Sequence, residues 1–310
     1  MARTELFSRQ QSGGVFTIAD FERHPGEIFF VHSGTGTDSA GYGKNPDAPF
    51  ASLSYAFSSD LLTASKGDKV YLMPGHVETI ADAQVAMDIA GVEVVGVGRG
   101  ANTPTIHFDH ANASVDISAN GCSIRNVRLL PSVTIVTIGI DIEAAVTDTT
   151  LEDIEVLPGE DGAGVDEFVL AIDVKAGCSR TRVSRIKHRQ HASAAGSVAS
   201  IKLTGASDDV VIEDGDFDMA GAALVAPING DTTLSTGVRI RRCIFVTDAG
   251  EPGFELLTGT TGVAEDCLVF GNFATLAAAL VGDGIARFRC ENIEVAAESG
   301  GVIGTASADD

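Results

Sequence analysis

Apolar residues recur along the chain in a short frame, at its first, fourth and sixth places. Eight copies of the frame follow one another, at residues 92–97, 124–129, 151–156, 183–188, 212–217, 240–245, 264–269 and 290–295. Their fourth places are separated by 32, 27, 32, 29, 28, 24 and 26 residues. A period of this length is typical of a solenoid, in which each coil buries its inward residues only against the coils on either side.

The segment before the frames has a different pattern. The stretch at residues 27–32 predicts a strand, and Phe50, Leu53, Phe57 and Leu61 follow the stripe of an amphipathic helix. A second apolar run, residues 67–73, ends at Pro74-Gly75, which predicts a strand closed by a turn. We expect this helix to cover the N-terminal end of the solenoid, where unpaired strand edges would otherwise face water.

A resemblance supports this interpretation. The Gly-Thr-Asp at residues 36–38, the Asn-Pro-Asp-Ala-Pro-Phe at 45–50, a short helix and the Gly-Asp-Lys-Val-Tyr-Leu-Met-Pro-Gly at 67–75 resemble the entry to right-handed parallel β-helix proteins of the pectate-lyase-like superfold. The similarity is greatest to their bacteriophage virion members. The resemblance implies an all-β fold, a right-handed parallel β-helix of about eight or nine coils with a short N-terminal capping helix.

The same patterns divide the chain into four parts. We expect an N-terminal arm over 1–27, an entry strand, loop and capping helix over 28–66, the parallel β-helix over 67–300 and a C-terminal tail over 301–310. The arm is polar with scattered Phe7, Phe16 and Phe21. It is either a frayed terminus or a segment that docks on a neighbouring subunit through these rings.

Composition narrows the class of partner. The 21 Lys and Arg residues against 43 Asp and Glu give a net charge of −22, which disfavours nucleic acid because phosphates require a positive footprint. No apolar run is long enough to span a membrane, and the first residues lack a signal-peptide core, so we expect synthesis in the host cytoplasm. The five cysteines have no metal-ligand spacing, and we expect buried thiols, with a disulfide between stacked coils as the alternative.

An acidic residue precedes each of four early frames. Strand alternation sends these carboxylates outward, and stacking would place them in one column about 5 Å apart, with Lys202 next. Such a column is either solvated surface or a weak calcium site, since Ca²⁺ takes six to eight oxygen ligands. The four candidates are Asp88, Asp116, Asp141 and Asp173.

One stretch of the chain is densely basic. It is either ordinary solvated surface or a subunit contact that meets the acidic column of a neighbour. Its interface candidates are Arg182, Arg185, Lys187 and Arg189.

We expect no catalytic residues and no cofactor. Polygalacturonases carry Asn-Thr-Asp, Asp-Asp, Gly-His-Gly and Arg-Ile-Lys in that order; here Asp208-Asp209 follows Arg185-Ile186-Lys187, and the other two motifs are absent. Glycoside hydrolysis needs two carboxylates at a defined separation, which these fragments do not supply. The absence of Trp also leaves little material for stacking sugar rings.

The sequence therefore favours a structural virion protein of a tailed bacteriophage. The most specific hypothesis is a capsid decoration or cement protein on the capsid surface, a homotrimer whose partners are itself and the major capsid protein. The alternative is a tailspike or tail-fibre module that binds or cleaves host polysaccharide, or a polysaccharide lyase or hydrolase.

Overall fold

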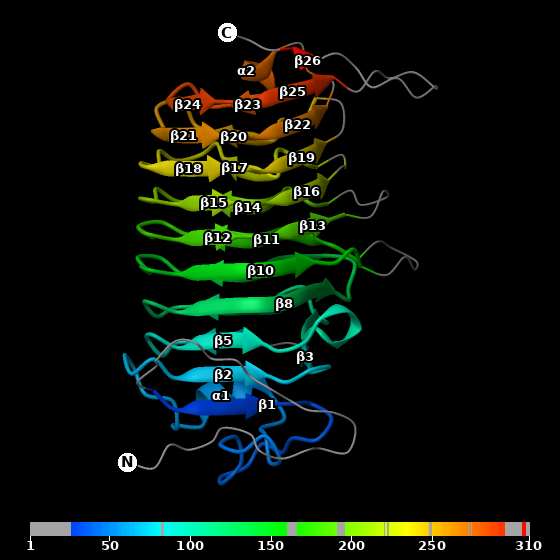
Figure 1. The fold of residues 1–310 in the computed structure, drawn as a ribbon, viewed down its shortest axis with the longest axis vertical. Coiled ribbons are helices and arrows are strands. Elements are labelled where there is room, and N and C mark those ends of the chain that lie inside the picture. The colour runs from blue at the N-terminus through cyan, green and yellow to red at the C-terminus, as the bar shows by residue number, and fades with distance from the viewer. Residues whose placement is uncertain are drawn as a thin grey trace.

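The chain folds into a tall stack of parallel β-coils (Figure 1). The computed structural model describes residues 26–81, 84–159, 166–190, 196–219, 221, 223–247, 250–271, 273, 275–294 and 306–307. The predicted arm, with Phe7, Phe16 and Phe21, and most of the predicted tail lie outside these residues. Within the described part, no helix is long and apolar enough to cross a membrane.

Three ladders of parallel strands run the length of the stack. The first ladder contains β1 (Ile28–Val31), β2 (Lys69–Leu72), β5 (Glu93–Gly96), the first halves of β8 (Ser123–Pro131) and β10 (Thr150–Val156), β12 (Arg182–Ser184), β15 (Val211–Glu213), β18 (Val238–Arg241), β21 (Gly262–Glu265) and β24 (Ile285–Phe288). The second contains β3 (Val77–Ile80), β6 (Thr105–Phe108), the second halves of β8 and β10, β13 (Lys187–Arg189), β16 (Asp216–Met219), β19 (Ile244–Thr247), β22 (Leu268–Gly271) and β25 (Glu291–Glu294). Because β8 and β10 turn the corner without a break, the first two ladders form a single 18-stranded sheet, which also includes β26 (Ala306–Ser307), antiparallel to β25.

The third ladder is a separate 8-stranded sheet. It contains β4 (Gln84–Met87), β7 (Ser114–Ile117), β9 (Val136–Ile142), β11 (Phe168–Val174), β14 (Ala199–Leu203), β17 (Ile228–Gly230), β20 (Phe254–Leu256) and β23 (Leu280–Val281). The prediction of an all-β parallel solenoid is therefore confirmed. A coil needs roughly one strand from each ladder, which explains the long and variable period of the frame.

Six of the eight predicted frames are in the predicted register. Their inward residues stack coil on coil, as Leu151 does on Ile124 and Ile212 on Val183. Aromatic rings extend the stacking, since Phe217 and Phe245 lie parallel with centroids 5.3 Å apart. The inward residues of the frame thus form a continuous core, because alternate side chains of each strand point to the same side.

The first and last frames are wrong by a few residues. Val94, two residues later than predicted, pairs with Ile124. Val92 is also buried, so the alternation of the sequence fits either choice. The last frame begins three residues earlier, because Arg287 pairs with Ala264. Its guanidinium donates to the carbonyls of Leu280 and Gly282, so a cation occupies a place where the pattern expects an apolar residue.

A short helix lies at the N-terminal end of the stack, where one was predicted. Helix α1 spans Leu53–Ser58, and the side chain of its N-cap, Ser52, accepts a hydrogen bond from the Tyr55 N–H. It is shorter than the predicted stripe because Asp60 takes a left-handed conformation, with φ of 58°. Its contacts with β1 and β4 put its apolar face on the first coils. Its role as a cap stays a prediction.

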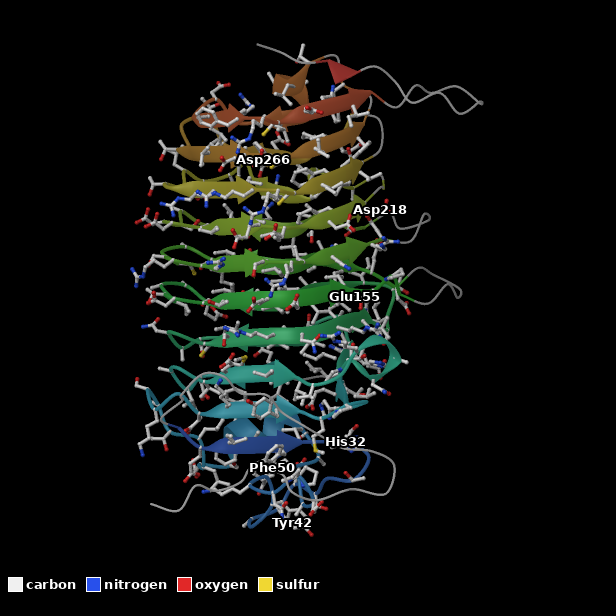
Figure 2. The ribbon with its side chains drawn as sticks, in the orientation of Figure 1. His32, Tyr42, Phe50, Glu155, Asp218 and Asp266 are labelled. Atoms are coloured by element: carbon white, nitrogen blue, oxygen red, sulfur yellow. The ribbon has the colours of Figure 1, made fainter. Side chains whose placement is uncertain are left out.

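A buried pair fixes the start of this helix. The Glu78 carboxylate accepts the Leu53 N–H at 2.8 Å and lies 3.1 Å from His76 Nε2. His76 Nδ1 accepts the Ser33 N–H, so both ring nitrogens are used in tying the entry segment to β3. Figure 2 shows Phe50 and Tyr42 at this same end of the stack.

The sequence predicts no helix after Val77, and this is wrong. Residues Leu276–Ala279 form α2 and residues Gly100–Asn102 form a turn of 3₁₀ helix. The Thr275 hydroxyl caps α2 by accepting the Ala278 N–H, and three alanines in a row favour helix. The segment is too short to show a helical period in the sequence.

Candidate interaction surface

A column of left-handed residues lines the corner between the first and second ladders. The third frame position has φ between 49° and 56° in seven successive coils, and none of these residues is glycine. They are Asn126, Asp153, Arg185, Asp214, Arg242, Asp266 and Arg289. This conformation costs roughly 1–2 kcal/mol for a residue with a side chain, so a recurring contact must offset it.

That contact is a repeated ion pair. Arg242 holds Asp214 with both arms of its guanidinium, Nε to Oδ1 at 2.6 Å and Nη2 to Oδ2 at 2.9 Å. The same Nη2 lies 3.3 Å from the carboxylate of Glu213, the residue before Asp214. Two further groups repeat the arrangement, Glu152-Asp153 with Arg185 and Glu265-Asp266 with Arg289. We call these three groups the Glu-Asp/Arg clamps.

Each clamp joins two adjacent coils. The acidic pair comes from one coil and the arginine from the next, so the sign at the third position alternates from Asp153 to Arg289. The guanidinium hydrogen bonds lower the pKa of both Asp214 and Asp266. At a second corner Arg180 holds Asp148 in the same bidentate way and lowers the pKa of that carboxyl to about 2.

The predicted basic cluster is largely neutralised by these contacts. Arg185 belongs to a clamp, Arg182 pairs with Glu213, and Arg189 lies 4.0 Å from Asp216. Lys187 is exposed and has no ion pair among the residues that the structure describes. Three of the four cations in the cluster therefore have acidic partners within the chain.

The predicted aspartate column exists in part. Asp116, Asp141 and Asp173 are in register on the third ladder, followed by Lys202. Asp88 is two residues out of register, because Ala86 pairs with Asp116, and we correct that assignment. The three carboxylates face outward from the sheet, yet each is at most 8% exposed.

Neighbouring side chains compensate this column. Lys175 Nζ lies 2.7 Å from Asp141 and 2.9 Å from Glu143, while the hydroxyl of Ser114 donates to Asp116. Burial raises the pKa of Asp141 to about 6. Across the described ranges no group of three or more His, Cys, Asp or Glu side chains is arranged to hold a metal ion.

A shallow groove of about 160 Å³ crosses the corner at β8, β10 and β13. Its charged groups are Asp153, Glu155, Arg185 and Lys187, and Asn126 and Thr103 complete its polar wall. Glu155 is paired with Arg128 at 2.7 Å, so Lys187 is its uncompensated cation among the described residues. The buried Ile186 between two exposed cations confirms that Arg185-Ile186-Lys187 is a copy of the frame.

The outward side of the second ladder changes character along the stack. In the middle coils it carries Arg128, Glu155, Lys187, Arg189 and Asp218. Figure 2 shows Glu155 and Asp218 at the same edge of the stack. In the last three coils the equivalent positions hold, apart from Glu291, only apolar residues, which we call the terminal apolar face: Ile244, Val246, Leu268, Phe270 and Ile293.

The cysteines are free thiols, as expected. Cys243, Cys267 and Cys290 occupy the same frame position in three successive coils. Contact with the Cys243 thiol and burial raise the pKa of Cys267 to about 12. A group with that pKa stays a thiol near neutral pH, which makes it a poor nucleophile and a poor metal ligand.

Sequence reasoning missed the clamps, although the signal was present. The third frame position reads Asp, Arg, Asp, Arg, Asp from residue 153 to residue 266, and Glu precedes each of these aspartates. Aligning the copies by their inward residues would have displayed the alternation.

Comparison with known proteins establishes the fold and no more. No protein-family model and no curated protein matches the sequence. Among solved structures, a rhamnogalacturonan lyase is similar with a TM-score of 0.52 and 12% identity, over 80% of this chain and 75% of that chain. The pectin methylesterase from Aspergillus niger gives 0.51 and 12%, over 89% and 88%. ORF18 of Geobacillus virus E2 gives 0.37 and 12%, over 84% and 59%. The first two of these structures show that the chain has a parallel β-helix fold.

Proposed function

We propose that this chain is a structural subunit of a tailed-bacteriophage virion that decorates the capsid and stabilises the head shell. The observation that carries the proposal is the internal pairing of outward charges. The clamps and the Arg128–Glu155 pair use exposed charged groups for contacts within the chain itself. A surface built in this way holds coils in register, which is the requirement of a scaffold.

The mechanism is mechanical. Stacked parallel strands give a stiff body, and a subunit that buries surface against several shell proteins adds free energy to each contact it bridges. Trimers at three-fold positions would repeat that contact with closed symmetry. The net charge of −22 would keep decorated particles apart.

Particles of the phage that encodes the chain provide the test. Immunogold labelling of intact virions should mark heads, and heads without the protein should release DNA at a lower temperature than decorated heads. Re-addition of the purified protein should restore the release temperature. Label confined to tails, or no label on any particle, would contradict the proposal.

Polysaccharide binding or cleavage is the second candidate, and one observation favours it. The groove at β8, β10 and β13 combines carboxylates with the uncompensated Lys187, a set suited to an acidic sugar. A lyase would release unsaturated products from acidic polysaccharides, detected by ultraviolet absorbance. Glu155→Gln and Lys187→Ala should each abolish that signal if the groove is the active site, and activity unchanged in both would exclude it.

A further inference from the structure

The terminal apolar face includes two of the exposed large apolar side chains of the described residues. Ile244 and Val246 are each 39% exposed, and they stand beside Leu268 and Phe270 on the next strand. Three neighbouring strands thus present apolar side chains outward. Contiguous apolar surface of this kind marks an interaction site.

Carboxylates border this face on both sides. Asp216 and Asp218 of β16 pair in register with Ile244 and Val246, and Glu291 of β25 pairs with Leu268. Asp216 reaches Arg189 only at 4.0 Å, and the Asp218 carboxylate has no ion pair among the described residues. A complementary partner therefore offers apolar groups flanked by cations.

The first 25 residues of the chain have this composition. Their three arginines balance Glu5, Asp20 and Glu22, so the segment contributes nothing to the net charge of −22. It contains Phe-x-Arg twice, as Phe7-Ser8-Arg9 and Phe21-Glu22-Arg23. In an extended chain, residues i and i+2 point to the same side, so each copy would present a ring and a guanidinium together.

We propose that the N-terminal segment of a second copy of the chain docks on the terminal apolar face. Phe7 and Phe21 pack on Val246 and Phe270, while Arg9 and Arg23 meet Asp218 and Glu291. The contact is heterologous, segment to face, so repetition of it gives a ring of subunits where the rotation between them closes. It does not depend on which shell or host surface the subunits meet.

The length of the N-terminal segment indicates that it comes from another copy of the chain. The described chain starts at Gly26, just before β1, and seven strand spacings separate β1 from β18, the first-ladder strand of the coil that contains β19. At about 4.8 Å each, this is about 34 Å along the stack. The five residues from Phe21 to Gly26 span at most about 18 Å. Within one chain only Phe7 could reach the face, whereas in a neighbour both rings can.

The experiment measures self-association of the full chain by sedimentation equilibrium. The face variant Val246→Asp and the segment variant Phe7→Ser/Phe21→Ser should each raise the dissociation constant at least about tenfold, the size expected for loss of a buried anchor. Val77→Asp is the matched control, because Val77 is equally exposed, at 39%, on the outward side of the same ladder near its other end. It should associate as the unaltered chain does.

Mixing the two defective variants gives the decisive result. Each retains the half that the other lacks, so the mixture should form dimers that neither forms alone. The charge exchange Arg9→Glu/Arg23→Glu with Asp218→Arg should likewise associate better than Arg9→Glu/Arg23→Glu alone. A monomeric full chain, a Val246→Asp variant that still assembles, or a mixture that fails to form dimers would overturn the proposal. The last outcome is expected for a contact of face with face.

Discussion

The middle and the end of the second ladder have the same backbone and opposite exteriors. Over β10, β13 and β16 the outward residues are charged, and most of them find partners within the chain. Over β19, β22 and β25 the equivalent places are apolar, apart from Glu291. In a parallel solenoid each coil buries its inward residues against the neighbouring coils, so the outward residues can form ion pairs between coils in one region and a contact surface in another.

The largest effect tests whether the inward sides of the two regions are equivalent. Phe217 is an inward residue of β16, whose outward residues are charged, and Phe245 is an inward residue of β19, whose outward residues are apolar. Both rings are fully buried. Phe217→Ala and Phe245→Ala should each cost about 3–5 kcal/mol in the free energy of unfolding, measured by urea denaturation. A loss below about 1 kcal/mol at either site would show that one region lacks a true core.

The clamps come next in magnitude. Arg242→Ala should lower the free energy of unfolding by less than either Phe→Ala change, because an exposed guanidinium that pairs with Glu213 and Asp214 is lost. Arg242→Gly should be milder by about 1 kcal/mol, since glycine accepts the left-handed conformation. Lys187→Ala is the control, because Lys187 is an exposed cation that has no ion pair among the described residues. If Arg242→Ala and Lys187→Ala lowered the free energy of unfolding equally, the clamp would not contribute to stability.

Two carboxylates should affect stability in opposite ways as the pH falls, because their pKa values shift in opposite directions. The pKa of Asp214 is lowered in the folded state, so its stabilising contribution is present above about pH 4 and is lost as the pH falls. The pKa of Asp141 is raised to about 6, so its contribution has the opposite sign and declines as the pH rises from about 4 through 6. Denaturation at several pH values should therefore show Asp141→Asn stabilising near pH 7, by about 1 kcal/mol, and neutral near pH 4. A constant difference between the two pH values would contradict the assignment.

The smallest effect concerns the terminal apolar face. Val246→Thr should change the unfolding free energy by less than about 0.5 kcal/mol, as is usual for a surface position. The same variant should nevertheless weaken self-association in sedimentation. A large loss of stability would mean that the face is part of the core and not a docking surface.

The sequence predicted the inward half of this molecule better than the outward half. Alternation around Ile154, Ile186 and Cys243 predicted strands and register, because burial leaves few choices of residue. Asp88 was misplaced because a shift of two residues keeps the same side of a strand, so alternation cannot detect it. The last frame failed at Arg287, where hydrogen bonds to carbonyls replace apolar burial. The clamps connect residues 23 to 33 positions apart, and only the pairing of coils brings them together.

The alternation at the corner also restricts how this solenoid can change in length. Each clamp takes its acid from one coil and its base from the next, so the chemical repeat is two coils although the backbone repeat is one. Loss or duplication of a single coil beside Asp214 would place like charges in neighbouring coils, whereas loss or duplication of two would restore the order. We therefore expect natural length variants of this protein to differ by even numbers of coils, because the alternating charges repeat every two coils while the backbone repeats every coil.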